Sequence, residues 1–573
     1  MKKLALLLIC LSLLTISCEK KSNAPTNEEI AKMEKEFKTY ATAFEDKAKV
    51  MYKDVALAYF TASVQNTPEN WKKLTDLQMK MNELYSDKAT FKKVLDFRTF
   101  FDNNGKSYMK DSLLARQLEV FYLSLIGNQV DTAKLNAVSR KQAAIETKYA
   151  NFRAKALGKE LTDNDVEDIL QSNKNSKQLQ EVWEAHKLIG PVVAEDIKAL
   201  VKMRNGIAKE LGYTNYHTMS LTLSEQDPQD LEKLFDELDV LTRDAYAKVK
   251  SEIDIVLAKQ NKIKPEELMP WHYQNRYFQE APKIFDIDLD KYYVKKDVVK
   301  LTDEYYTGIG FDIKKLIANS DLYEKPGKNQ HAYCIDIDRE AGDIRVLCNV
   351  KNNTSWMETM LHEYGHASYS YYHGKDLPWS LKSAAHTFTT EAVAMFFGRL
   401  STNPNWIQAM TGIKDKEKES IRATCAKQEQ YRQLVFSRWV QVMYRFEKSM
   451  YANPDQDLNK LWWDLVEKYQ MLKRPANRNM PDWATKIHIA TSPCYYHNYL
   501  LGELLASQIN FTIMKEIGSQ NPEAESFVGN KKIGNFFISK VFAPGARYKW
   551  NDMIERATGE KLTPKYYAMQ YVK

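Results

Sequence analysis

Apolar residues recur at three- and four-residue spacing along most of the chain, which is the pattern that amphipathic helices produce. The clearest segments run from Ile30 to about Asn66, from Trp71 to Tyr85, from Leu113 to Leu125 and from Asp230 to Val256. No tandem repeat and no long linker interrupts them. The pattern predicts a mainly α fold in which residues 30–573 form a single domain.

One stretch departs from the helical spacing. Residues Ala332 to Ile337 and Asp343 to Val350 alternate between apolar and polar positions, with a turn at 339–342 between them. We therefore expect one β-hairpin here. Cys334 and Cys348 lie roughly opposite one another on this hairpin, and both a cross-strand disulfide and two buried thiols are compatible with that placement.

Composition agrees with long helices, because glycine (20) and proline (17) are scarce among 573 residues. The 82 Lys and Arg residues alternate with 75 Asp and Glu residues, and the net charge is +7. Such mixing is typical of solvated helix faces, and no long basic run is present. The charge pattern gives no reason to expect a nucleic-acid partner.

The first residues have the character of a targeting segment. Lys2 and Lys3 precede the apolar run Leu4 to Leu14, which is too short to span a bilayer, and Cys18 follows soon after. This order resembles a bacterial lipoprotein signal. It implies a signal peptide at 1–17, lipidation of Cys18, a tether at 18–29, and export to a periplasmic or cell-surface location with a membrane anchor. An ordinary secretory signal is the alternative.

The sequence HExxH occurs at His362, Glu363 and His366. Residues four apart share one face of a helix, so the two imidazoles can bind the same zinc ion. Glu363 lies beside that face and can take a proton from an attacking water molecule. Two surface histidines on a helix would be the structural alternative, but the motif favours one catalytic Zn²⁺.

A catalytic zinc site needs a third protein ligand. Glu391 is the only carboxylate in an otherwise apolar helical stretch, where an unpaired charge would be costly to bury. It is therefore the best third ligand, ahead of His373 and His386, whose positions are loop-like. A donor for the reaction's oxyanion must come from elsewhere, and the polar and aromatic residues between 486 and 499 are the densest candidates.

Several strings around these residues resemble the angiotensin-converting-enzyme family of peptidyl-dipeptidases. They are KDLPWSLKSAAHTFTTEA (375–392), HAYCIDIDREAGDIRVLC (331–348), WWDLVEKYQ (462–470), KIHI (486–489) and, more weakly, LEKLFDELDVLTRDAYAKVK (231–250). The likeness covers about residue 190 to the C-terminus. It implies a large helical ellipsoid split by a deep central cleft, with the hairpin beside zinc, and a monomer that removes dipeptides from oligopeptide C-termini.

The resemblance also assigns roles to individual residues. It implies that His362, His366 and Glu391 bind zinc, that Glu363 is the general base and acid, and that Tyr499 donates to the oxyanion. The remaining roles concern the substrate: His488 and His331 bind its carbonyls, the backbone of Ala332 pairs with it as a strand does, and its C-terminal carboxylate is anchored by Lys486, Tyr496 and Gln274. Tyr495 is the fallback for Tyr496.

Three positions depart from the family pattern. Met395 replaces an aspartate that usually supports the metal site, and loss of such an outer partner can lower metal affinity or activity. Val466 and Asn498 stand where the family has chloride-binding arginines. We therefore expect activity that does not depend on chloride.

Two other functions remain open. An endopeptidase that resembles the thimet-oligopeptidase family shares HExxH and the distant glutamate, and would cleave short peptides internally. A non-catalytic peptide-binding lipoprotein is supported only by Met395. The hairpin string and the pair Lys486 and His488 favour the peptidyl-dipeptidase.

Overall fold

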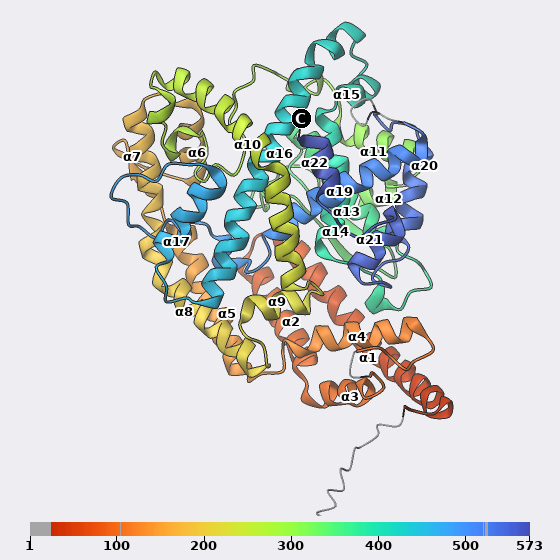
Figure 1. The fold of residues 1–573 in the computed structure, drawn as a ribbon. Coiled ribbons are helices and arrows are strands. Elements are labelled where there is room, and N and C mark those ends of the chain that lie inside the picture. The colour runs from red at the N-terminus through yellow and green to blue at the C-terminus, as the bar shows by residue number, and fades with distance from the viewer. Residues whose placement is uncertain (1–23, 103–104, 520, 522–524, 573) are drawn as a thin grey trace, which may run out of the picture.

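The computed structural model describes residues 24–102, 105–519, 521 and 525–572. The expected signal peptide at 1–17 and the lipidated Cys18 lie outside these residues. Helices account for most of the described chain, and the strands form two small antiparallel hairpins, so the prediction of a mainly α fold is confirmed (Figure 1).

The first helix, α1 (Asn27–Val64), begins inside the expected tether. The Thr26 hydroxyl accepts a hydrogen bond from the backbone of Glu29, and the Glu29 carboxylate accepts one from the Thr26 backbone at 2.7 Å. This reciprocal pair satisfies two of the N–H groups that a helix start leaves without partners. Residues 27–29, which the sequence assigned to the tether, are helical and belong to α1.

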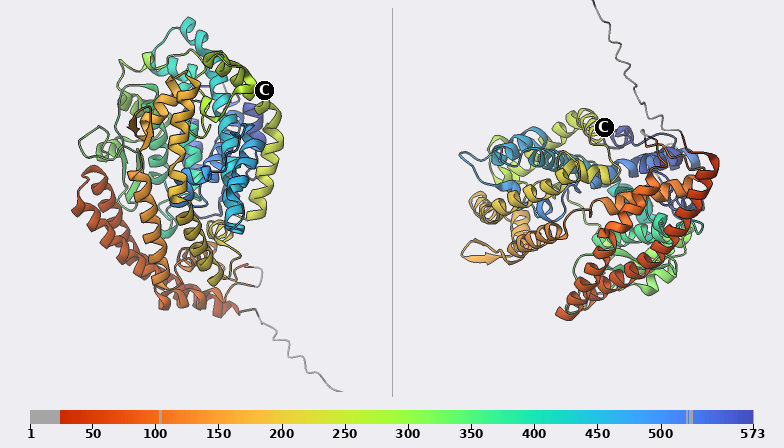
Figure 2. Two further views of the ribbon diagram at one scale, coloured as in Figure 1. Left: turned by 90° about the vertical axis from the view of Figure 1, so that its left-hand side faces the viewer. Right: turned by 90° about the horizontal axis from the view of Figure 1, so that it is seen from below.

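Three further helices complete the N-terminal part. They are α2 (Pro68–Ser86), α3 (Lys88–Arg98) and α4 (Ser112–Ile126). Phe37 of α1 packs edge-on against Phe97 and Phe121, with ring centroids 5.2 and 6.0 Å apart. This cluster buries the apolar stripes that the sequence spacing predicted. Figure 2 shows the four helices along one side of the molecule.

The next segment contains a hairpin that the sequence did not predict. Its elements are α5 (Thr132–Asn151), β1 (Ala154–Ala156), β2 (Lys159–Leu161), α6 (Asp163–Ser172), α7 (Ser176–Lys187), α8 (Ile189–Glu210), α9 (Tyr216–Leu223) and α10 (Pro228–Asn261). Strands of three residues are too short to give a recognisable alternation. The expectation of a single hairpin is corrected on this point.

The expected hairpin is present and is formed by β3 (Tyr333–Asp338) and β4 (Asp343–Leu347), with Cys334 opposite Val346. Both Cys334 and Cys348 are free thiols. The far edge of β4 is bridged by Asp321, whereas β3 pairs with β4 alone among the described strands. The outer edge of β3 therefore carries no other strand of the described chain.

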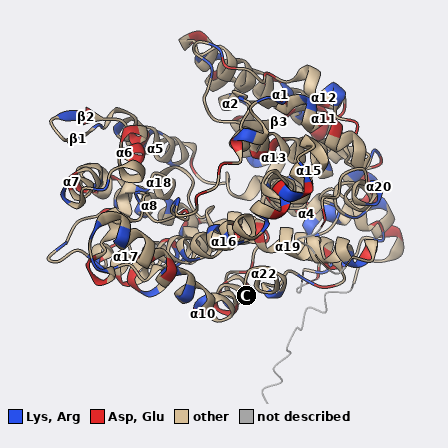
Figure 3. Ribbon diagram, turned by 90° about the horizontal axis from the view of Figure 1, so that it is seen from above, with Lys and Arg blue, Asp and Glu red and all other residues tan. Residues whose placement is uncertain are grey.

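The other helices follow in chain order. They are α11 (Val298–Ile309), α12 (Lys314–Asn319), α13 (Thr354–Tyr371), α14 (Thr387–Gly398), η5 (Arg399–Thr402), α15 (Pro404–Thr411), α16 (Asp415–Ala452), α17 (Leu458–Leu465), η7 (Asp482–Thr485), α18 (His488–Thr491), α19 (His497–Ile517), α20 (Lys531–Phe536), α21 (Trp550–Thr558) and α22 (Lys565–Tyr571). Seen from above, α5 to α8 and α17 form one group, and α11 to α13 and α20 form another (Figure 3). Basic and acidic residues are mixed on both groups.

The main hydrophobic core extends from Ile145 to Tyr571 and includes α13, α14 and α19. Among the described helices, none has both the length and the apolar character needed to cross a membrane.

One glycine sets how closely η7 approaches α8. A Cβ added at Gly190 of α8 would lie 2.5 Å from the carbonyl oxygen of Pro481 and 3.2 Å from the Thr485 side chain. We predict that Gly190→Ala displaces η7 and lowers the free energy of unfolding by about 1–3 kcal/mol, as overpacking does. Chemical denaturation would measure the change.

The matched control is Gly206→Ala in the same helix, where an added Cβ meets nothing within 4 Å. That substitution should stabilise the protein by about 0.5–1 kcal/mol, because alanine loses less backbone entropy on folding. Equal effects at the two positions would contradict the packing argument.

Candidate active site

Helices α13 and α14 bring together the three residues expected to bind a metal. His362 and His366 lie one turn apart on α13, with their Nε2 atoms 3.2 Å apart. Glu391 on α14 places an Oε2 atom 3.7 Å from the Nε2 of His362 and 3.8 Å from that of His366. These ligand atoms all lie within 4.8 Å of one another.

This arrangement fits a zinc ion. Tetrahedral ligands at about 2.1 Å from zinc lie about 3.4 Å apart, close to the three observed separations. Burial lowers the pKa of His362 to about 4 and holds that of His366 well below its ordinary value, so both rings are neutral near pH 7. The Nδ1 atom of His366 is 2.7 Å from the hydroxyl of Thr390, which orients the ring and leaves Nε2 for a metal.

Glu363 lies between the metal ligands and the hairpin. Its side chain is buried, and burial together with the charge of Glu391 raises its pKa to about 8. The backbone N–H of Cys334 in β3 hydrogen-bonds to the Glu363 carboxylate and opposes this rise. The candidate base is thus fixed beside the free edge of β3.

The third helix at the site is α19, which crosses α14 at a glycine. A Cβ added at Gly502 would lie 3.1 Å from both the Cβ of Glu391 and the sulfur of Met395. Met395 therefore packs between the two helices one turn after Glu391. Burial, with the nearby charge of Glu503, raises the pKa of Glu391 to about 7.

Two tyrosines lie close to Glu391. The phenol of Tyr495 lies close enough to the Glu391 carboxylate to lower the pKa of that carboxylate. The phenol oxygen is 3.4 Å from the hydroxyl of Thr387, and the Tyr495 ring packs edge-on against that of Tyr499 at 5.3 Å. Burial and the neighbouring charge of Glu391 raise the pKa of Tyr499, so its hydroxyl stays protonated at neutral pH. Either phenol can donate a hydrogen bond near the metal ligands.

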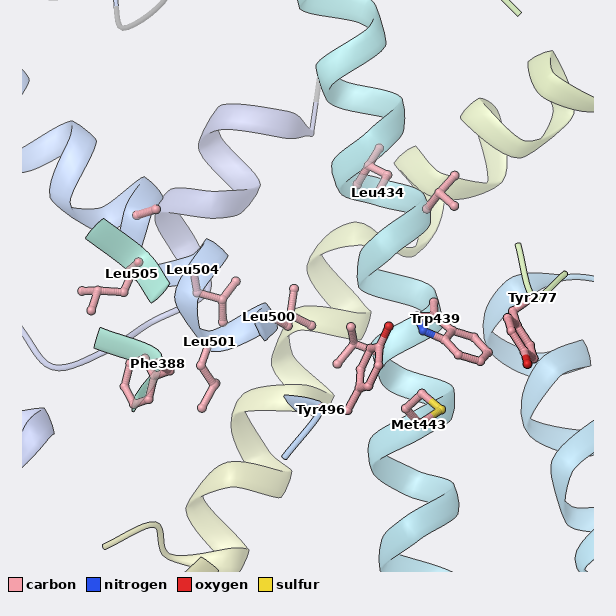
Figure 4. Packing of buried hydrophobic residues seen from close by; sticks show 14 of the residues in the cluster. Tyr277, Phe388, Leu434, Trp439, Met443, Tyr496, Leu500, Leu501, Leu504 and Leu505 are labelled. Carbon is pink, nitrogen blue, oxygen red and sulfur yellow. The ribbon is translucent and has the colours of Figure 1, made fainter. Parts of the chain in front are cut away.

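Lys486 is a buried cation that forms no ion pair with any described residue. Its Nζ atom donates to Oε1 of Gln279 at 2.6 Å, and it lies 5.0, 5.6 and 5.4 Å from the ring centroids of Tyr277, Trp439 and Tyr496. Burial lowers its pKa to about 8. Figure 4 shows Tyr277 and Tyr496 on either side of Trp439. The fallback residue Tyr495 instead lies beside Glu391.

Gln274 does not belong to this group, which corrects the expectation for it. Its backbone is left-handed (φ 58°), its Oε1 accepts from the backbone of Lys283 at 2.9 Å, and its Nε2 donates to Gln260. Gln279, in the same loop, supplies the amide at Lys486. The reversed backbone at Gln274 turns that side chain away, and the sequence does not reveal this.

The other expected substrate residues lie around these two groups. His488 packs against the ring of Tyr496 at 5.1 Å, and burial lowers its pKa to about 4. Ala332 immediately precedes β3. His331 is exposed, and its backbone N–H donates to Asn329. Its ring forms no hydrogen bond with the part of the chain that the structure describes.

The side chains of Val466 and Asn498, which stand at the family's chloride-binding positions, are both buried. Val466 is buried, and Asn498 is buried with its Oδ1 accepting from Gln226 at 2.8 Å. Gln226 also contacts His497 at 2.8 Å.

A buried carboxyl supports the segment that carries the tyrosines. Glu447 of α16 accepts a hydrogen bond from the backbone N–H of Cys494 at 3.0 Å, and Cys494 has a left-handed backbone (φ 56°). Such a conformation is costly for a residue with a side chain unless its surroundings fix it. Glu447 therefore helps to fix the segment from which Tyr495, Tyr496 and Tyr499 extend.

Comparison with known proteins gives one family. The family model described as angiotensin-converting enzyme, of the M2 peptidases, matches residues 31–573. The chain is 21% identical over 438 residues to an angiotensin-converting enzyme of Theromyzon tessulatum, covering 71% of this chain and 70% of the relative. It is 20% identical over 588 residues to that of Rattus norvegicus, covering 96% of this chain but 43% of the relative.

A weaker likeness involves a different peptidase. The chain is 23% identical over 256 residues to an oligopeptidase named PepF from Bacillus subtilis (strain 168), covering 43% of this chain and 35% of the relative.

The geometry of the metal ligands predicts the effect of changing one of them. Glu391→Gln keeps the side-chain shape but replaces an anionic ligand with a neutral amide. We expect zinc affinity to fall by more than the roughly 10–100-fold that loss of an outer partner costs. Zinc retained after dialysis against a graded chelator would measure this. His331→Gln, an exposed histidine, is the control, and a Glu391→Gln protein that keeps zinc as tightly as the parent would contradict the assignment.

The burial of Glu447 predicts a dependence of stability on pH. Burial raises its pKa from 4.5 to about 8 in the folded protein, so the folded state retains a proton that the unfolded state loses as pH rises. This carboxyl therefore destabilises the fold progressively between about pH 4.5 and pH 8. Glu447→Gln should gain stability relative to the parent over that range, as measured by denaturation at pH 5 and pH 8. A stability difference that is constant with pH would contradict the prediction.

Proposed function

Because the chain belongs to the angiotensin-converting enzyme family of metallopeptidases, we propose that it is a zinc-dependent peptidase that removes dipeptides from the C-termini of oligopeptides. The observation that carries this proposal is the pairing of a metal-ligand triad with Lys486, a buried cation that has no carboxylate partner among the described residues.

His362, His366 and Glu391 would hold the metal. Zinc bound there would supply a Lewis acid that polarises the scissile carbonyl and lowers the pKa of water. Glu363 accepts a proton from the attacking water and delivers it to the nitrogen of the leaving amine as the C–N bond breaks. Its fixed position at the β3 backbone suits it to both transfers.

Tyr499 donates its phenolic proton in a hydrogen bond to the oxyanion that forms on the scissile carbonyl. The raised pKa of Tyr499 supports this role, since a protonated phenol is required. Tyr495 is held by Glu391 and orients Tyr499 through their ring contact.

Lys486 would fix the position of cleavage. A peptide's C-terminal carboxylate pairs with the ammonium group of Lys486, while Gln279 and the rings of Tyr277 and Tyr496 exclude water around it. A pairing of this kind in a buried site is strong because few competing solvent contacts remain. The rest of the peptide adds as a strand to the free edge of β3 at Ala332, with His488 and His331 beside its carbonyls.

Further parts of the proposal concern conditions and location. Val466 and Asn498 carry no positive charge, which supports activity without chloride activation. We propose a monomer that is exported by a signal peptide at 1–17 and anchored to a bacterial membrane by lipid on Cys18. The N-terminal residues Lys2 to Cys18 support this location.

An endopeptidase that acts on short peptides is the second candidate function. The likeness to the oligopeptidase PepF favours this function. The position of Tyr495 at Glu391 also favours it, because two phenols, those of Tyr495 and Tyr499, then lie near the metal ligands. This reading requires no free C-terminus on the substrate.

Product analysis tests the proposed reaction. We expect the zinc-loaded protein to shorten a mixed peptide pool in steps of two C-terminal residues, as detected by mass spectrometry. Glu363→Gln should lower the rate by about 10²–10⁴-fold, because the general base is lost while the metal ligands remain. Unchanged hydrolysis by the Glu363→Gln protein would overturn the mechanism.

Amidated peptides test the carboxylate anchor separately. Peptides with C-terminal amides should be cleaved much more slowly than the free acids, and Lys486→Gln should remove most of that preference. If both peptide forms are cleaved equally by the parent, the endopeptidase is favoured instead. A protein that binds zinc and peptides without cleaving either form would be a non-catalytic binding protein.

A further inference from the structure

A cavity lies where the chain leaves the metal-ligand helix α14, and Lys486 is not among its lining residues. It has a volume of about 460 Å³, which is within the range of roughly 300–1,000 Å³ for small-molecule sites. Its walls come from the end of α14, from η5 and the start of α15, from residues 422–430 of α16, and from α10, α19 and α22. These helices contact one another directly, and Figure 1 shows them grouped around the C-terminus.

Of the four basic residues that line this cavity, three form an ion pair with a described residue and one does not. Its basic residues are Lys248, Arg399, Arg422 and Lys427, and its one acidic residue is Glu429. Three of the four basic residues bind carboxylates outside the lining: Arg399 binds Glu503, Arg422 binds Glu419, and Lys427 binds Glu252 at 2.6 Å. The acidic Glu429 binds Arg432 at 2.7 Å.

Lys248 differs from the other three basic residues. It is exposed at the cavity and has no carboxylate within ion-pair distance among the described residues; Glu252, one helical turn away and bound to Lys427, attracts it only at longer range. Because the other charges are balanced, a ligand with a single negative charge fits the cavity better than a dianion, which would also meet the surrounding carboxylates.

The remainder of the lining is apolar or neutral. Phe396 and Phe527 stack with ring centroids 5.5 Å apart, and Leu400 and Tyr571 are buried beside them. Asn403, Asn510, Gln430 and Gln570 add amide groups. Two lining residues also have a buried polar atom without a hydrogen-bond partner among the described residues, Nε of Arg399 and Oε1 of Gln570. A binding site for a small amphipathic molecule has this mixture of apolar wall and few polar groups.

From this lining we infer that the cavity binds a small amphipathic monocarboxylate, with its carboxylate at Lys248 and its aromatic or branched apolar part against Phe396, Phe527 and Tyr571. The site is separate from the group around Lys486 and does not rest on the proposed peptidase activity. One lining residue, Phe396, belongs to α14, the helix that also carries the metal ligand Glu391.

Calorimetric titration of the zinc-loaded protein tests this inference. The probe is N-acetyl-L-phenylalanine, and its neutral counterpart is N-acetyl-L-phenylalaninamide. Titrations are made on the Lys486→Gln protein so that the proposed substrate anchor does not contribute. We expect saturable binding of the acid that is at least about tenfold tighter than binding of the amide, a difference of about 1.4 kcal/mol.

Three variants locate the binding and define its charge requirement. Ala426→Trp fills the cavity from an exposed position on α16 and should weaken acid binding at least about tenfold, whereas Gln428→Trp, exposed on the same helix outside the lining, should not. Lys248→Gln should weaken binding of the acid but not of the amide.

A second measurement does not rely on these variants. Cys425 is a buried lining residue, so bound acid should slow its alkylation by N-ethylmaleimide, while Cys494, outside the cavity, reacts at an unchanged rate. Mass spectrometry would follow both sites. Absence of saturable binding, equal affinity for acid and amide, or acid binding that is insensitive to Ala426→Trp would each overturn the inference.

Discussion

The candidate active site depends on the close approach of three helices. A Cβ at Gly365 of α13 would lie 3.0 Å from the Cα of Ala394, and one at Gly502 of α19 would lie 3.1 Å from the Cβ of Glu391. Glycine at both positions lets the helix backbones come close enough for side chains from α13 and α14 to meet at one metal, and for α19 to present its tyrosines to them. In a densely packed interior, an added methyl group at such a contact shifts backbone and not only side chains.

The buried acids and the buried lysine of the candidate site have pKa values shifted in opposite directions, each toward the neutral form. Burial raises the pKa values of Glu363 and Glu391 to about 8 and 7, and it lowers that of Lys486 to about 8. Loss of water is the largest cause of each shift, and a neighbouring like charge adds to it: Glu391 at Glu363, Glu503 at Glu391 and Arg276 at Lys486. A divalent cation would compensate the two carboxylates, and a substrate carboxylate would compensate the lysine. Perturbed groups of this kind gather at functional sites, and here the sign of each shift indicates the sign of the missing partner.

The helices, the β3–β4 hairpin and the pair His362 and His366 could be predicted because each depends on local spacing. The four-residue interval from His362 to His366 fixes a shared helix face whatever the rest of the fold does, and Glu391 is conspicuous as a charge in an apolar run. The substrate residues were harder to predict. Gln274 and Gln279 lie in one irregular loop with left-handed backbone at Gln274 and at Phe278, and in this loop it is the amide of Gln279 that reaches Lys486. The β1–β2 hairpin was missed because three residues are too few to show alternation.

The sequence alone determined which segments become helices and which residue types can bind a metal, since helix periodicity and ligand chemistry are properties of short stretches of chain. Only the tertiary structure decided which tyrosine lies at Glu391 and which at Lys486, and that Lys486 is buried without a counter-ion. These outcomes depend on contacts between residues far apart in the chain, such as Lys486 with Gln279 and Glu447 with Cys494. Packing and desolvation set such contacts, and neither is encoded in the spacing of nearby residues.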